Sequence, residues 1–118
     1  MSTDIRTRLQ DLNNGILTGR LLEVFDKYYA EDVVMSENGV SDPNRIGKAA
    51  NRAYEEYFVN NATFHGARVD NVIVDGDQSA VTWWMDLEMG GQRFERTQIA
   101  VQSWKNGQIV KETFFYAG

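Results

Sequence analysis

AVTWWMDLEMGGQRFERTQIAVQSWKNGQIVKETFFY, residues 80–116, forms three long runs of alternating apolar and polar residues separated by two glycine-containing turns. The pattern predicts strands over Ala80–Met89, Gln92–Lys105 and Gln108–Tyr116, joined by hairpin turns at Gly90–Gly91 and Asn106–Gly107. These strands exceed the usual length of about five or six residues. Long twisted strands curl, so we expect a strongly curved sheet whose concave side other elements must fill.

The Gly90–Gly91 turn predicts a register for the first hairpin. A two-residue loop pairs Met85 with Arg96 and places the opposite charges of Glu88 and Arg93 face to face. One face of the hairpin is then apolar, collecting Trp83, Met85, Leu87 and Phe94. The other face collects Trp84, Asp86, Glu88, Arg93 and Glu95. We expect the first face to be buried and the second to be mostly in water.

The first half of the chain is predicted to be helical. Apolar residues recur at helical spacing over residues 4–17, where Gly15 and the Thr18–Gly19 pair weaken or end the helix, and again over 21–29. The remaining predicted elements are a short strand at 33–35, a loop at 36–44, a helix at 45–60 capped by Asn44, and a strand at 69–74. The apolar face of the third helix is expected to be Ala49, Ala50, Ala53, Tyr54, Tyr57 and Phe58.

These elements together predict one domain over residues 1–118, because no repeat or Pro/Gly-rich linker divides the chain. The fold class is α+β. Three N-terminal helices pack in a strongly curved antiparallel sheet, mixed at its edge, and the cone that results encloses a pocket that the helices fill only in part.

Composition narrows the class of protein. Hydrophobic residues make up 42% and charged residues 25%, the ordinary globular balance. The net charge is −5 and no basic cluster occurs, so nucleic acid is not an expected partner. No apolar stretch approaches the ~20 residues of a membrane span, and the polar N-terminal sequence lacks a signal-peptide core. We therefore expect a cytoplasmic protein without a membrane partner.

No cofactor or metal is expected. Cysteine is absent, which excludes a disulfide scaffold, a zinc ribbon and a thiol nucleophile. No glycine-rich phosphate loop follows a strand, and no serine stands in a nucleophile elbow. His65 is the only histidine, which argues against a metal triad, although a mixed carboxylate site stays open.

Four segments carry a family resemblance. They are Tyr28–Val34, Arg45–Ala50, Val72–Asp77 and Trp104–Val110. In this order and at these separations the chain resembles the nuclear transport factor 2-like superfamily, which includes ketosteroid isomerases, SnoaL-like polyketide cyclases and limonene epoxide hydrolases. The resemblance implies a cone-shaped fold, an apolar ligand in its mouth and dimerisation through the sheet. Since members include enzymes and binding modules, it does not decide the function.

The resemblance implies a role for Glu37, which falls where ketosteroid-isomerase-like members place their catalytic carboxylate. Desolvation at a pocket mouth would raise its pKa and suit it to proton transfer. The alternative is an exposed loop acid. The same comparison puts the family's two oxyanion donors near Leu12 and Ala100, neither of which donates a hydrogen bond. A standard ketosteroid isomerase is therefore not expected.

Polar residues on the long strand are candidates for substrate binding. Arg96, Gln98 and Gln102 share the face of Trp83 and Met85, where a few polar groups would orient a ligand among apolar walls. The alternative is that the strand end leaves the core and Arg96 extends into water.

The role of Glu112 depends on the Asn106–Gly107 turn. With a bulged loop, Val110, Glu112, Phe114 and Tyr116 face inward; with a plain two-residue loop, Ile109, Lys111, Thr113 and Phe115 do so instead. In the first case, which we favour, Glu112 is a catalytic candidate that pairs with Arg96 or a ligand, and Tyr116 contributes to binding. In the second case Glu112 is a surface acid.

Two further residues complete the candidate site. His65 lies where the third helix leads into the first long strand, near the predicted pocket rim, and its ordinary pKa of about 6.5 suits acid–base work. A structural or solvated histidine is the alternative. Tyr57 fits a core position, although its hydroxyl could reach a ligand.

Two classes of function follow. The first is a ligand-binding domain whose pocket receives a small hydrophobic molecule. The second is a cofactor-independent isomerase, cyclase or hydrolase of a carbonyl or epoxide-like compound, acting by acid–base catalysis. Apolar groups expected on the outer sheet face, among them Trp84, Ile99 and Val101, predict a homodimer formed through the sheet.

Overall fold

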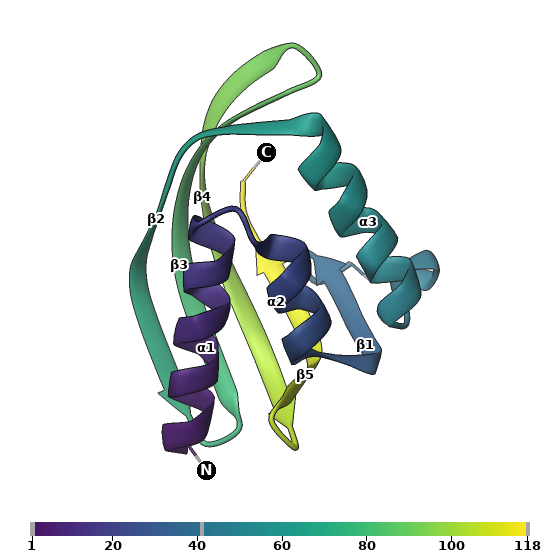
Figure 1. Cartoon of the computed structure of the whole chain (residues 1–118), viewed down its shortest axis with the longest axis vertical. Coiled ribbons are helices and arrows are strands. Elements are labelled where there is room, and N and C mark those ends of the chain that lie inside the picture. Colours follow the sequence, from purple (N-terminus) through teal and green to yellow (C-terminus); the bar gives the residue numbers. More distant parts are fainter. Residues whose placement is uncertain (1, 41, 118) are drawn as a thin grey trace.

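Three helices lie within the curve of one bent sheet, as Figure 1 shows. The structure is a computed structural model that describes residues 2–40 and 42–117. Its elements are α1 (Ser2–Leu17), α2 (Leu21–Tyr28), β1 (Tyr29–Glu37), a 3₁₀ turn (Pro43–Arg45), α3 (Lys48–Asn61), β2 (Ala62–Asp75), β3 (Gln78–Met89), β4 (Gln92–Lys105) and β5 (Gln108–Phe115). The sheet order is β1-β5-β4-β3-β2, with β1 parallel to β5 and the other pairs antiparallel. The predicted α+β cone with a mixed edge is confirmed. Within the described residues no helix has the length and apolar character needed to span a bilayer.

The predicted register of the β3–β4 hairpin is confirmed. Met85 pairs with Arg96 and Leu87 with Phe94. Trp83, Met85 and Leu87 are buried, with exposures of 6%, 8% and 1%, because the helices cover the concave face of the sheet. Glu88 does lie opposite Arg93. Arg93 nevertheless forms its ion pair diagonally with Asp86, at 3.0 Å, because its long side chain spans one more position.

The second hairpin combines features of both alternatives. Its turn is a plain two-residue loop, in which Asn106 and Gly107 have φ values of 53° and 78°. The bulge lies instead at Val110 inside β5, since Trp104 pairs with Ile109 and Ser103 pairs with Lys111. Ile109 is therefore buried, and Glu112 and Phe114 face the concave side beyond the bulge. The expectation that Val110 faces inward is wrong.

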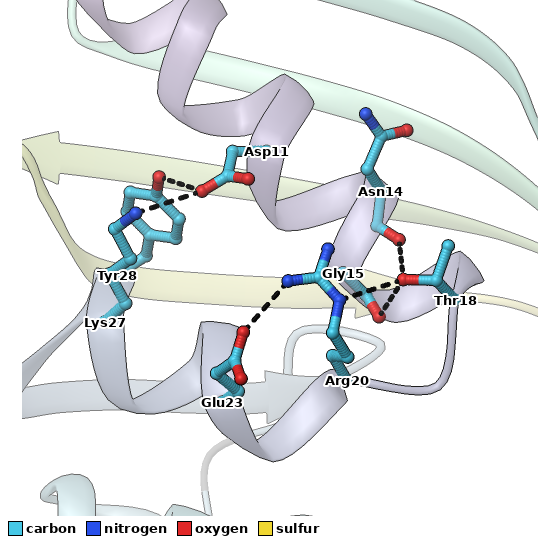
Figure 2. Close-up of polar contacts among 8 residues, drawn as sticks. All are labelled: Asp11, Asn14, Gly15, Thr18, Arg20, Glu23, Lys27 and Tyr28. Atoms are coloured by element: carbon cyan, nitrogen blue, oxygen red, sulfur yellow. Dashed lines mark hydrogen bonds and ion pairs between the residues drawn. The ribbon is translucent and has the colours of Figure 1, made fainter.

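The α1–α2 hairpin fills one end of the cone. In Figure 2 Asp11 of α1 accepts hydrogen bonds from Tyr28 and Lys27 of α2, at 2.5 and 3.2 Å. α1 continues through Gly15 and ends at Leu17, directly before the predicted end signal Thr18–Gly19. Gly15 permits close packing of α2, because a Cβ built at Gly15 would lie 2.3 Å from Val24 Cγ1.

Several predicted boundaries shift around β1. β1 has nine residues rather than three, because it is an edge strand that pairs along β5, and it therefore includes Glu37. The predicted loop 36–44 is correspondingly shorter; its Ser41 lies outside the described residues. Asn44 does not cap α3 but lies in the 3₁₀ turn, and Gly47, with φ of 96°, stands at the start of α3.

The buried face of α3 differs from the predicted one. Asn51 is fully buried, and its amide donates to the carbonyl oxygens of Arg45 and Gly47, at 2.7 and 2.8 Å. This anchor turns Glu55 toward the concave side and leaves Tyr54 and Tyr57 exposed by 43% and 63%. Ala49 and Ala53, also predicted to be inward, are exposed. The hydrogen bonds of the buried Asn51 amide therefore contribute more to the rotation of α3 than burial of the small Ala49 and Ala53 side chains would.

Candidate functional site

A cavity of about 630 Å³ lies between the helices and the concave face of the sheet. Its walls are mainly apolar, and they include Phe25, Phe58, Trp83, Met85, Leu87 and Phe114. A smaller set of polar side chains also borders it: Glu37, Glu55, Arg96, Gln98, Gln102 and Glu112. Leu12 of α1 and Ala100 of β4 also border the cavity, so the two positions that lack an oxyanion donor do face this space.

Glu112 is held by a chain of hydrogen bonds at the buried end of the cavity. The Tyr29 hydroxyl donates to one carboxylate oxygen, and the Gln102 amide donates to the other at 2.7 Å. Gln102 in turn accepts from Ser79 Oγ at 2.6 Å, which accepts from Trp104 Nε1 at 2.9 Å. In this series of hydrogen bonds every donor points toward the Glu112 carboxylate. The Glu112 side chain is therefore held in one position.

A second hydrogen-bond network holds the Glu37 carboxylate. Arg45 Nη1 donates to Glu37 Oε2 at 3.0 Å, and the Tyr116 hydroxyl donates to Oε1 at 2.9 Å. Arg45 is 6% exposed and stacks on Tyr54, 3.8 Å from the ring centroid. Its Nη2 has no hydrogen-bond partner within residues 2–40 and 42–117. Both oxygens of Glu37 are thus occupied.

Glu55 differs from both other carboxyl groups. It borders the cavity from α3, is half-buried, and forms no hydrogen bond or ion pair with any described residue. Burial raises the pKa of Glu55 to about 7; the negative charge of Glu112 adds to the rise and Arg45 opposes it. This carboxyl group is free to exchange a proton with a molecule in the cavity.

The pKa of Glu112 is also raised to about 7, chiefly by burial. The hydrogen bonds from Tyr29 and Gln102 oppose the rise, because they favour the ionised form. Burial also raises the pKa of Tyr29 well above its ordinary value, so this hydroxyl stays a donor. The cavity therefore contains two carboxyl groups that both titrate near neutral pH and influence one another.

The other predicted site residues fall into two groups. Trp83, Met85, Gln98, Gln102 and Tyr116 border the cavity, and Tyr57 lies at its rim. His65 does not border it. It lies on the outer face of the sheet, 3.0 Å from Glu88 Oε1, because β2 alternates and presents Phe64 and Gly66 to the cavity.

Sequence reasoning missed Glu55 and Arg45. The spacing of Asn51, Glu55 and Phe58 is that of one helix face, but two of the three are polar and alanines crowd the opposite face. Arg45 stands in an irregular turn, where no periodicity indicates burial. No cluster of three or more His, Asp or Glu side chains among the described residues is arranged to hold a metal ion.

Comparisons with known proteins agree with the fold. A family model described as SnoaL-like domain matches residues 1–116. A candidate SnoaL-like polyketide cyclase from Mesorhizobium loti is 28% identical, with a TM-score of 0.83 over 95% of this chain and 98% of that one. An LEH-like epoxide hydrolase of M. tuberculosis is 16% identical, with a TM-score of 0.80 over 98% of this chain and 84% of that one. An NTF-2 like protein of unknown function from Burkholderia xenovorans is 15% identical, with a TM-score of 0.77 over the same shares. No curated protein matches the sequence significantly.

Proposed function

Because the chain belongs to the SnoaL-like domain family, we propose that it binds a small, largely apolar molecule in the cavity and catalyses proton transfer on it without a cofactor. One observation carries this proposal: Glu55 borders the cavity without a partner among the described residues and has a pKa of about 7. A base with this pKa is half ionised at neutral pH, which suits it both to take and to return a proton.

The chemistry follows from the groups around the cavity. The Glu55 carboxylate takes a proton from a carbon next to a carbonyl group, and the C–H electron pair moves to form an enolate. Return of that proton to a different carbon gives an isomer. Attack of the enolate on a second carbonyl closes a ring, and the proton then goes to the new alkoxide. Gln98, which borders the cavity, supplies a hydrogen bond to the developing oxyanion.

Two relatives in this fold are described as enzymes that act on small molecules. The Mesorhizobium loti protein is described as a candidate cyclase, and the M. tuberculosis protein as an epoxide hydrolase. The apolar residues Leu12 and Ala100 argue against a steroid-type isomerase that uses donors at those positions. Glu37, although predicted as the base, has both oxygens occupied by Arg45 and Tyr116, so we assign the proton transfer to Glu55.

The test uses a panel of aryl ketones in D₂O, with deuterium exchange at the carbon next to the carbonyl followed by proton NMR. Wild-type protein should accelerate exchange of at least one ketone, and Glu55→Gln should remove the acceleration. Glu31→Gln, an exposed acid on β1, is the matched control and should behave as wild type. Binding without exchange would leave a ligand-binding domain; absence of binding throughout the panel would refute the proposal.

We also propose that two copies associate through the outer face of the sheet. Ile99 and Phe115 are register partners on this face, and both are more than 40% exposed. Ile73 on β2 is 56% exposed and pairs with Ala80 on β3. Ala80 in turn pairs with Val101 on β4, two residues from Ile99. The apolar residues therefore form a continuous band across β2, β3, β4 and β5. Burying such a band is favourable, which supports the homodimer expected from the sequence. The expected cytoplasmic location stays a prediction.

A further inference from the structure

Arg96 is a cation that borders the cavity without an acidic partner. Its guanidinium lies 4.1 Å from the Tyr116 ring centroid and 5.2 Å from that of Phe94. These ring contacts hold the side chain, yet none of its N–H groups donates a hydrogen bond to any described residue. A guanidinium carries five donors in a planar fork, and two parallel donors match the two oxygens of a carboxylate.

We infer that Arg96 forms a carboxylate subsite of the cavity and that the molecule bound there is an amphipathic monocarboxylate, whose apolar body fills the rest of the cavity. The inference rests on the proposed function, since it names the class of molecule that occupies the same site. The two ring contacts restrict the Arg96 side chain, so less side-chain entropy is lost when a carboxylate binds to its guanidinium.

The charge balance around Arg96 favours an anion. Glu37 is neutralised by Arg45 and accepts from Tyr116, the residue that stacks on Arg96. Glu55 and Glu112 each have a pKa of about 7, so near neutral pH a substantial fraction of each is uncharged. Neither carboxyl group forms an ion pair with Arg96 among the described residues, so the guanidinium charge is left for a ligand anion.

The number of positive charges at the cavity favours a ligand with one negative charge over a phosphate ester, which has two. Among the described residues that border the cavity Arg96 is the one basic side chain. Arg45 is buried beyond this border and already paired with Glu37. A dianion would need a second cation, whereas one guanidinium fork satisfies one carboxylate.

The test compares three probes with the same apolar body: 2-naphthylacetate, its neutral amide 2-naphthylacetamide, and the cation 2-(2-naphthyl)ethylamine. Affinities are measured by calorimetry at pH 7 and low salt for wild type, Arg96→Gln and Arg93→Gln. Arg93 lies on the outer face, paired with Asp86, and is the matched control for removal of a charge.

We expect wild type to bind the carboxylate roughly tenfold or more tightly than the amide, the size of effect that one charge-assisted bidentate contact gives. Arg96→Gln should remove this preference and leave the affinity for the amide within about threefold, while Arg93→Gln should keep it. Equal binding of carboxylate and amide, tighter binding of the amine, or an unchanged preference in Arg96→Gln would overturn the inference while the proposed function stands. If no probe binds, and none of the ketones binds either, both proposals fail.

Discussion

The hydroxyl group of Tyr29 on β1 donates a hydrogen bond to the carboxylate of Glu112 on the neighbouring strand β5. Tyr29 also stacks on Phe25, with ring centroids 4.4 Å apart. The ring and the hydroxyl thus have separate roles: the ring packs in the core, and the hydroxyl stabilises the ionised form of a buried acid.

Tyr29→Phe should therefore raise the pKa of Glu112 further above 7, because it keeps the stacked ring and removes a donor to the carboxylate. The loss should also destabilise the fold by about 1–2 kcal/mol at a pH where Glu112 is ionised. The measurement is a carbon-13 NMR titration of the Glu112 carboxyl, assigned by comparison with Glu112→Gln. Tyr57→Phe, at the exposed rim, is the control. A pKa that stays the same or falls in Tyr29→Phe would contradict this account.

Burial of Glu112 also predicts how stability depends on pH. Its folded pKa, about 7, lies above its ordinary value of 4.5. Since the unfolded chain ionises first, this group favours folding below about pH 4.5, and that contribution is lost as the pH rises to 7. The total is of the order of 3 kcal/mol, and no further loss arises from Glu112 at higher pH.

Glu112→Gln isolates this contribution from that of other titrating groups. Urea unfolding of both proteins between pH 4.5 and 8 should show wild type losing stability relative to Glu112→Gln up to pH 7, followed by a constant difference. A constant difference over the whole range would mean that Glu112 titrates at its ordinary pKa in the folded state.

The alternation of β3 and β4 sufficed to predict their register, because a period of two and a Gly-Gly turn leave one pairing that buries Trp83 and Leu87. The Val110 bulge had no such signal. An apolar residue at 110 suits either face, and the shift becomes apparent only when β5 must pair with both β4 and β1. Glu112 reaches the concave face by this bulge and not by the bulged turn that was predicted.

The candidate site was predictable where it lies on regular strands and not where it depends on α3. Periodicity assigns polar residues to water, whereas Asn51 is buried to satisfy the carbonyl oxygens of Arg45 and Gly47. These hydrogen bonds set the rotation of α3 about its axis, which brings Glu55 to the cavity. His65 is the converse case, a residue suited to catalysis whose strand position directs it outward to Glu88.

Gly15→Ala should destabilise the protein although alanine is the better helix former. The gain in helix propensity is at most about 1 kcal/mol. The new methyl group would lie 2.3 Å from Val24 Cγ1, and overpacking of this kind costs about 1–3 kcal/mol. Thermal unfolding should show a lower melting temperature for Gly15→Ala. The double variant with Val24→Ala should be more stable than the sum of the single effects; additive effects would show that the two residues do not compete for space.

Ile99→Lys should convert the proposed dimer to a monomer, because it places a charge within the apolar band on the outer face of the sheet. Light scattering coupled to size exclusion gives the mass directly. Gln92→Lys, which adds the same charge at the exposed β3–β4 turn, should leave the dimer intact. A wild-type monomer at all concentrations, or dissociation by both variants alike, would refute association through this face.

The rate of ketone deuterium exchange should rise with pH and level off above about pH 7, since Glu55 acts as a base only when ionised and has a pKa of about 7. Glu112→Gln removes the neighbouring charge that raises this pKa, so the midpoint of the profile should move to lower pH. Initial rates in buffers from pH 5 to 9 give both midpoints. A profile that falls with rising pH, or a midpoint that Glu112→Gln does not move, would assign the proton transfer to a group other than Glu55.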